Sequence, residues 1–285
     1  MTPALHGLRI LSLALNLPGP AALMRCRRMG ATCTKLEPPA GDPMAQYQRA
    51  TYDELHEGVE VQQADLKNAE GQATLHRLLA QTDVLLSSFR PSAIDKLGLG
   101  WDRLHQRYPA LSHVAIVGAP GARAEEPGHD LTYLADNGLV TGLELPATLF
   151  ADMSGSLMAT EAVLQAALRR ARGEVGALYE VALSEAARYI ALPRSWGLTA
   201  PTGAVGGAHA GYRVYACKDG RVAVAALEPH FAAALCELAG VPAGDRRAKG
   251  APATREAVAA FIASKTREQL DRLAVERDIP LHTMA

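Results

Sequence analysis

The sequence predicts an α/β protein, with a Rossmann-like open parallel sheet followed by a smaller α+β domain. Within the first 120 residues, short apolar runs alternate with segments of helical period, which is the rhythm of βαβ units. From residue 130 the pattern is mainly helical, and a hairpin pattern follows residue 211. We therefore expect a sheet domain over 1–198, a linker over 199–211 and a small domain over 212–285.

The strands of the sheet are expected where apolar runs end at glycine, proline or polar residues. The first run, "LRILSLAL", is continuously apolar, as is typical of a parallel strand covered on both faces. The other expected strands are 32–39, 59–66, 82–89 and 111–119, and the helices between them are 21–29, 69–81 and 101–108. Neither G-x-G-x-x-G nor a Walker A sequence occurs, so a standard dinucleotide or P-loop site is not supported.

The second half contains a long helix and a hairpin. The segment 154–173 predicts the helix, with Ser154 as a possible N-cap and Gly173 at its end. A strand over 177–183 and a helix over 184–192 follow. The linker is rich in glycine and small residues, and "YRVYACKDGRVAVAAL" predicts a hairpin that turns at Lys218–Gly220. Two or three helices are expected to finish the chain.

The composition indicates a globular protein that works on small molecules. The 285 residues include 29 basic and 30 acidic side chains, so no basic excess points to nucleic acid. The apolar run "ILSLALNL" is too short to span a bilayer, and we interpret it as a buried strand without a membrane partner. Four cysteines without a C-x-x-C favour a reducing, cytoplasmic location and offer no zinc motif, so no metal is expected.

Three ionisable residues occupy positions suited to chemistry. His129 precedes a predicted helix in "PGHDLTYLADNG", and Asp152 follows an apolar run just before a helix, near free backbone N–H groups. Glu228 ends a hydrophobic strand before Pro229. Each also has a structural interpretation, because Asp is a common helix cap, an acidic residue before proline is a common helix entry, and a histidine near a turn is often structural. These residues alone do not show that they meet.

Several longer blocks resemble family III coenzyme A transferases, and most closely the α-methylacyl-CoA racemase branch. The blocks include "DVLLSSFRPSAIDKLGLGWDRL", "PGHDLTYLADNG", "FADMSGS" and "GYRVYACKDGRVAVAALEPHF", and the resemblance runs from about residue 5 to 280. The FRP-x5-LGLG and G-H-D-x-x-Y patterns are its specific parts. The resemblance implies the fold of this family, an acyl-CoA thioester as substrate, no cofactor apart from that coenzyme A, and a homodimer.

The resemblance also implies roles for individual residues. Asp152 matches the aspartate that transferases of the family use as a nucleophile on the thioester. His129 matches the histidine that racemases pair with the same aspartate, and Glu228 matches the glutamate that supports this histidine. The positions matching substrate or coenzyme A contacts are Arg90, Lys67, Leu97, Gly98, Leu99, Gly100 and Tyr133.

The first functional hypothesis is therefore an acyl-CoA racemase that inverts the α-carbon of a 2-methyl-branched thioester through an enolate. A neutral imidazole on one face and a protonated carboxylic acid on the other would exchange the proton. Burial among Leu149, Phe150 and Met153 would raise the pKa of Asp152, and N–H groups at the next helix start would hold the enolate oxygen. The alternatives are a coenzyme A transferase with Asp152 as nucleophile and a non-catalytic acyl-CoA-binding homologue.

Some features depart from the family pattern. Acidic residues stand where relatives carry a basic N-R-x-K stretch, and their charge would repel coenzyme A phosphates: Asp53, Glu54, Glu57 and Glu60. The segment 153–156 replaces a glycine-rich turn, and Thr148 replaces a side-chain amide. The chain ends at Ala285, where relatives continue into a segment that returns to the first domain. We therefore expect this return segment to be missing, which leaves open whether the homodimer interlocks as in the relatives.

Overall fold

The computed structural model describes residues 2–242 and 250–285. The chain divides into two compact units, Met1–Ala191 and Leu192–Ala285. The division falls a little before residue 198, where the sequence places the end of the sheet domain.

The first unit is built on a six-stranded parallel sheet in the order β3-β2-β1-β4-β5-β6. The strands are β1 (Arg9–Ser12), β2 (Thr32–Glu37), β3 (Glu60–Gln63), β4 (Val84–Ser87), β5 (Ser112–Val117) and β6 (Leu178–Ala182). This order is that of the doubly wound α/β fold, so the prediction of a Rossmann-like sheet is confirmed. Each apolar run that the sequence singled out forms one of these strands.

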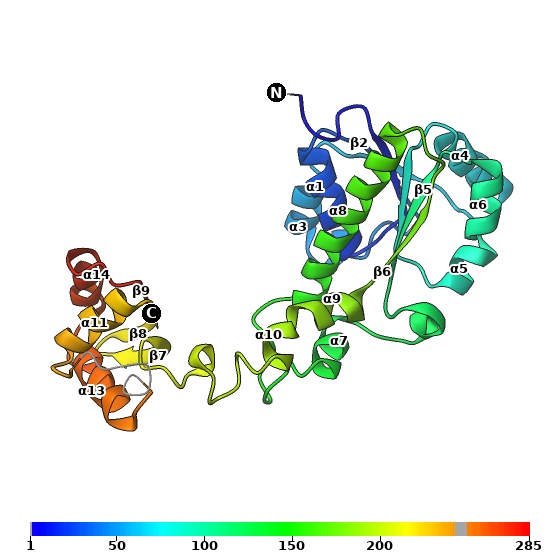
Figure 1. Ribbon diagram of the computed structural model, residues 1–285. Helices are drawn as coiled ribbons and strands as arrows, with labels where there is room; N and C mark the ends of the chain where they lie inside the picture. Colours follow the sequence, from blue (N-terminus) through cyan, green and yellow to red (C-terminus); the bar gives the residue numbers. More distant parts are fainter. Residues whose placement is uncertain (1, 243–249) are drawn as a thin grey trace. The chain divides into compact units, whose positions relative to one another are not determined.

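Helices cover both faces of this sheet (Figure 1). On one face lie α1 (Pro18–Arg28) and α8 (Phe150–Ala171), and on the other lie α4 (Ala69–Leu79), α5 (Pro91–Lys96) and α6 (Trp101–Arg107). Alternate residues of a strand pack against the helix layers on opposite faces of the sheet. On β4, Leu86 packs towards α1 and α8, while Leu85 packs towards α4 and α6. The central strands β1, β4 and β5 are therefore almost wholly buried, whereas β3 at the edge of the sheet is polar and largely exposed.

Short helices at the carboxyl ends of the strands complete the unit. They are α2 (Met44–Tyr47) and α3 (Arg49–Leu55) after β2, the 3-10 helix η1 (Gly121–Glu125) and α7 (Asp130–Asp136) after β5, and α9 (Leu183–Ile190) after β6. The sequence pattern did not predict α2, α3 or α5, because one or two turns give a weak helical period, although the pattern did predict α6, which is as short as α3. The short helices at the strand ends position loops at the edge of the sheet where ligands bind in open α/β folds.

The long helix begins earlier than the sequence suggested. Ser154 does not cap α8, because its hydroxyl donates to the Phe150 carbonyl at 2.6 Å, one turn before it in the same helix. A serine inside a helix can bond the preceding turn in this way instead of capping a terminus. The N-cap position is Leu149, and Asp152 lies in the first turn instead of before the helix.

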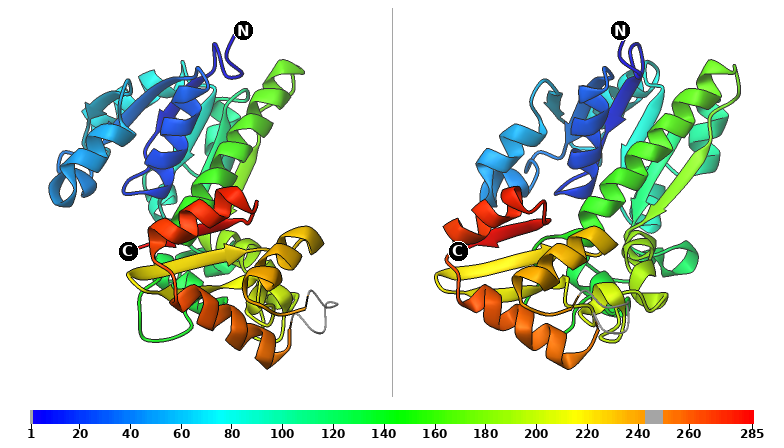
Figure 2. Two further views of the ribbon diagram at one scale, coloured as in Figure 1. Left: turned by 90° about the vertical axis from the view of Figure 1, so that its left-hand side faces the viewer. Right: turned by 60° about the vertical axis from the view of Figure 1, so that its left-hand side comes forward.

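The second unit is an antiparallel sheet in the order β7-β8-β9 with helices packed on it (Figure 2). The elements are α10 (Leu192–Ser195), η2 (Ala204–Gly206), β7 (Tyr212–Cys217), β8 (Gly220–Ala225), α11 (Pro229–Leu238), α13 (Pro252–Ala263), α14 (Arg267–Glu276) and β9 (Leu281–Met284). The predicted hairpin and its turn are confirmed, whereas β9 was not predicted from its four residues. No helix in the described ranges is long and apolar enough to cross a membrane.

The sheet core contains one buried histidine whose charge state should control stability. His113 on β5 is 2% exposed, and its Nε2 lies 2.8 Å from the hydroxyl oxygen of Ser87 on β4. Burial lowers the pKa of His113 to about 4. In the unfolded chain the His113 imidazole takes up a proton near pH 6.5, whereas in the folded chain it does so only near pH 4. The free energy of unfolding is therefore at its full value above pH 6.5 and falls as the pH drops towards 4.

We expect His113 to account for a loss of about 2 kcal/mol in the free energy of unfolding between pH 7.5 and pH 5. Denaturant unfolding of the wild type and of His113→Gln at both pH values measures this. The wild type should lose more stability on acidification than the variant, by about that amount. Equal losses in the two proteins would show that the proton uptake of His113 does not differ between the folded and unfolded states.

Candidate active site

Two helix starts lie together at the carboxyl edge of the sheet. His129 is the N-cap residue of α7, with its backbone N–H donating to the Thr132 hydroxyl at 3.0 Å and its imidazole exposed. Asp152 lies in the first turn of α8, half-buried. His129 acts electrostatically on the Asp152 carboxyl, and the residue after it, Asp130, bonds the backbone of Asp152.

Asp130 joins the two helices. Its carboxylate is 5% exposed and accepts the backbone N–H of Asp152 at 3.0 Å. Asp130 does not cap the helix that follows it. His129 holds the N-cap position of α7, and the Asp130 side chain instead satisfies a free N–H at the start of α8. Asp130 and Asp152 are thereby held close together.

Burial and this neighbouring carboxylate raise the pKa of Asp152 to about 6, while the nearby His129 opposes the rise. The direction agrees with the sequence-based expectation, but the source of burial differs. The expected neighbours Leu149, Phe150 and Met153 are 46%, 44% and 41% exposed and do not enclose the carboxyl. With this pKa, about a tenth of the Asp152 carboxyl groups carry a proton at pH 7.

The first N–H groups of α8 are largely engaged. Asp130 accepts from Asp152, the Thr148 carbonyl accepts from Phe150, and the Leu149 carbonyl accepts from Met153. The predicted role of this helix start in holding an enolate oxygen is therefore restricted, because an engaged N–H is a weaker donor to a substrate. The segment 153–156 is part of the helix, where Gly155 packs against the Leu183 side chain instead of forming a turn.

Tyr133 and Arg90 lie on the same side of the site. The Tyr133 ring is 8% exposed and passes so close to Gly128 that a side chain there would meet its hydroxyl at 2.6 Å. Burial and the charge of Asp152 raise the pKa of Tyr133, and Arg90 lowers it. Arg90 is exposed at the N-cap of α5, directly after β4. Asp152 and Arg90 thus both act electrostatically on the Tyr133 phenol.

The other predicted contacts line neighbouring loops. Lys67 is exposed between β3 and α4, and its backbone N–H donates to Asp65 at 3.0 Å. The segment 97–100 turns the chain from α5 to α6, with Gly98 at a φ of 75° that favours glycine. Leu99 is fully buried in the core under this turn, so only the backbone of the turn and the half-buried Leu97 remain for a ligand.

Glu228 belongs to the second unit. It is the exposed N-cap residue of α11, directly before Pro229. Its predicted support of His129 therefore stays a prediction.

Sequence patterns missed the contributions of Asp130 and Tyr47. Tyr47 ends α2 and is 65% exposed, and the negative charge of Asp152 acts on its phenol. The signal for Asp130 was its place beside His129, but only the spatial approach of α8 shows which group it contacts. The acidic residues that depart from the family pattern are exposed on α3 and β3, and Asp53 pairs with Arg49 at 2.9 Å.

Proteins with known names resemble this chain over much of its length. It is 30% identical to the human α-methylacyl-CoA racemase over 246 residues, which are 80% of this chain and 63% of that protein. It is 32% identical over 202 residues to a probable fatty acyl-CoA transferase of Mycobacterium tuberculosis, covering 64% of this chain and 51% of that protein. The chain thus spans between half and two thirds of the length of these curated relatives.

Solved structures match the whole chain. The crystal structure of a hypothetical protein from Mycobacterium tuberculosis has a TM-score of 0.85 and 26% identity, and the match covers 100% of this chain and 86% of that one. A CAIB/BAIF family protein from Brucella suis has a TM-score of 0.83 at 23% identity, a level that shows the fold alone, over 100% of this chain and 85% of that one. The sequence profile of CoA-transferase family III matches residues 5–285, and the chain belongs to this family.

Proposed function

We propose that the protein is an acyl-CoA racemase or epimerase that inverts the α-carbon of a 2-methyl-branched acyl-CoA thioester. The pairing of His129 with Asp152, a carboxyl group whose pKa is raised to about 6, carries the proposal. A neutral His129 imidazole removes the α-proton and leaves an enolate. A protonated Asp152 then returns a proton to the opposite face, and the two residues exchange roles for the other enantiomer.

The raised pKa suits Asp152 to both roles. A carboxyl group with an ordinary pKa is a poor proton donor at neutral pH because it is almost fully ionised there. A pKa of about 6 keeps a usable protonated fraction and still leaves a competent base when the group is ionised. Asp130 contributes to this value by its charge, since two neighbouring carboxylates resist simultaneous ionisation.

The surroundings of this pair fit an acyl-CoA. Arg90 is exposed at the edge of the site and Lys67 is exposed at the carboxyl end of β3, where both cations are free to meet phosphate groups. The resemblance to the human α-methylacyl-CoA racemase supports the same substrate class. A cytoplasmic homodimer without a cofactor beyond the coenzyme A of its substrate belongs to this proposal, because it rests on the same family resemblance.

A coenzyme A transferase is the second candidate, favoured by the ionisation of Asp152. Most Asp152 carboxyl groups are ionised at pH 7 and can act as nucleophiles. In this reaction the carboxylate attacks the thioester carbonyl, the coenzyme A thiolate leaves, and a mixed anhydride remains on Asp152. Several relatives carry transferase names, including one from Mycobacterium tuberculosis and a cinnamoyl-CoA:phenyllactate CoA-transferase.

Racemisation predicts exchange of the α-proton with solvent. In D₂O, the wild type should incorporate deuterium at the α-carbon of 2-methylacyl-CoA, as followed by mass spectrometry. His129→Ala and Asp152→Asn should each slow the conversion of one pure enantiomer into the other, followed by chiral chromatography, by about 10²- to 10⁴-fold, because each removes one partner of the proton transfer. His6→Ala, which changes an exposed histidine before β1, is the control and should keep the wild-type rate. An unimpaired His129→Ala variant would exclude the proposed mechanism.

Transfer and racemisation differ in their dependence on His129. If the protein transfers coenzyme A, hydroxylamine added during turnover should convert the Asp152 carboxyl into a hydroxamate, detected as a mass change in the peptide that contains it. His129→Ala should leave this labelling intact, and Asp152→Ala should abolish it. Full transferase activity in Asp152→Ala would exclude the aspartyl mechanism.

Asp130 should determine the pH at which Asp152 becomes a base. In the direction that uses ionised Asp152, kcat/KM should rise with pH through about 6. Asp130→Asn removes the neighbouring negative charge, so the charged form of Asp152 is favoured and its pKa falls. The acid limb of the pH profile should therefore move to lower pH.

The matched control for this shift is Asp136→Asn, which removes an exposed aspartate from the same helix α7. Its profile should coincide with that of the wild type. An acid limb that stays in place in Asp130→Asn would contradict the role of Asp130.

A further inference from the structure

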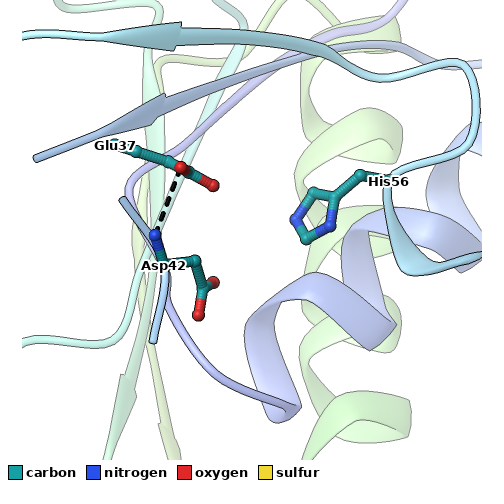
Figure 3. A group of neighbouring side chains, drawn as sticks. All are labelled: Glu37, Asp42 and His56. Carbon is teal, nitrogen blue, oxygen red and sulfur yellow. Dashed lines mark hydrogen bonds between the residues drawn. The ribbon is translucent and has the colours of Figure 1, made fainter. Parts of the chain in front are cut away.

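A buried lysine lies within the first unit at the end of β2. The Lys35 side chain is 0% exposed, and its Nζ lies 2.6 Å from Asp42, 3.1 Å from Glu37 and 2.8 Å from the Nε2 of His56. Figure 3 shows these three partners directed towards a common centre, with the bond from the Asp42 N–H to Glu37 dashed. Their ligand atoms lie within 4.8 Å of one another, a spacing that would suit a metal ion.

The Lys35 ammonium occupies the place that a cation would take. It has three N–H donors and three acceptors within hydrogen-bond distance. The Nδ1 of His56 is 2.7 Å from the Tyr52 carbonyl, so this nitrogen carries the proton and Nε2 accepts from Lys35. Burial and the positive charge of Lys35 lower the pKa of His56, which keeps the ring neutral. The cluster is therefore a fully bonded internal ion pair.

The Asp42 carboxylate also bonds the backbone of two neighbouring segments. It accepts the backbone N–H of Asn16 at 3.1 Å and that of Met44, the first residue of α2, at 2.9 Å. Asn16 has a φ of 62°, the left-handed region that a residue with a side chain seldom adopts. The neighbouring Leu15 N–H donates to the Ser88 hydroxyl at 3.1 Å. Hydrogen bonds to Asp42 and Ser88 thus hold the loop after β1 in an uncommon conformation.

Tyr47 lies at the other end of α2, on the side of Asp152. Its hydroxyl donates to the Asn16 side-chain oxygen at 3.4 Å, while 65% of the residue is exposed. Partial burial together with the charges of Asp42 and Asp152 raises the pKa of Tyr47. Two exposed polar side chains, those of Asn16 and Tyr47, therefore follow the carboxyl ends of β1 and β2, the sheet edge at which Asp152 also lies. The Asp42 carboxylate holds the backbone of Asn16 and of the first residue of α2.

We propose that the Lys35–Asp42 ion pair is a positioning element of the acyl-CoA site, which holds Asn16 and α2 so that the Tyr47 hydroxyl meets a carbonyl oxygen of the substrate beside Asp152. A buried ammonium and carboxylate tolerate little displacement, because each lost hydrogen bond leaves an unpaired charge away from water. The substrate part of this inference rests on the proposed function, whereas the positioning of Tyr47 does not.

The positioning is tested without any reaction. NMR titration of the Tyr47 phenol, assigned with Tyr47→Phe, reports whether this ring senses Asp152. Asp152→Asn should lower the pKa of Tyr47 in the wild-type background, and this effect should disappear in Lys35→Met, which keeps the side-chain length but removes the charge. An equal effect of Asp152→Asn in both backgrounds would overturn the role of Lys35. If Lys35→Met does not unfold cooperatively, and so is not properly folded, the same comparison is made in the Asp42→Asn background.

The contact with substrate is tested by calorimetry with acetyl-CoA. Tyr47→Phe removes one exposed hydroxyl and should raise the Kd by about 3- to 10-fold, the effect of one neutral hydrogen bond. Tyr189→Phe, at a 68% exposed tyrosine of α9, should leave the Kd unchanged. An unchanged Kd in Tyr47→Phe would overturn the inference. Failure of the wild type to bind acetyl-CoA would instead overturn the proposed function, with the titration of Tyr47 still deciding the positioning.

Discussion

The structure of the first unit depends on one constraint, which is that a parallel sheet must be covered on both faces. The central strands β1, β4 and β5 are buried on both sides because α1 and α8 cover one face of the sheet and α4, α5 and α6 cover the other. Polar groups with chemical uses are thereby displaced to the strand ends. His129, Asp152 and Arg90 all lie in segments that follow the carboxyl ends of the strands, as expected for ligand sites in this fold.

The candidate site is an electrostatic arrangement in which no residue acts alone. Asp130 binds the backbone of Asp152 and at the same time opposes the ionisation of its side chain. His129 acts in the other direction, so the proton affinity of Asp152 reflects a balance of three groups. The Lys35 cluster follows a different rule. Its buried ammonium has a hydrogen-bond acceptor for each of its three N–H groups, which makes the cluster a rigid support instead of a reactive centre.

Local sequence patterns were sufficient for the strands and the long helices. Apolar runs and helical periods depend on neighbours in the chain, and the hairpin at Lys218–Gly220 was predicted from its turn residues in the same way. The short helices α2, α3 and α5 were missed because at most two turns of helix give a weak periodic signal. The start of α8 was misplaced because it depends on a partner from another segment, the Asp130 carboxylate.

By itself, the sequence determined the fold class and the family, and it predicted His129 and Asp152 as the catalytic residues. Tertiary structure decided the environment of these residues: which carboxylate approaches Asp152, which side chains leave it half-buried, and which residues lie close to it. It also decided that Lys35, a residue type usually found on surfaces, is completely buried. The physical reason is that burial and charge pairing arise between segments far apart in the chain, whereas periodicity and turn chemistry act between neighbours.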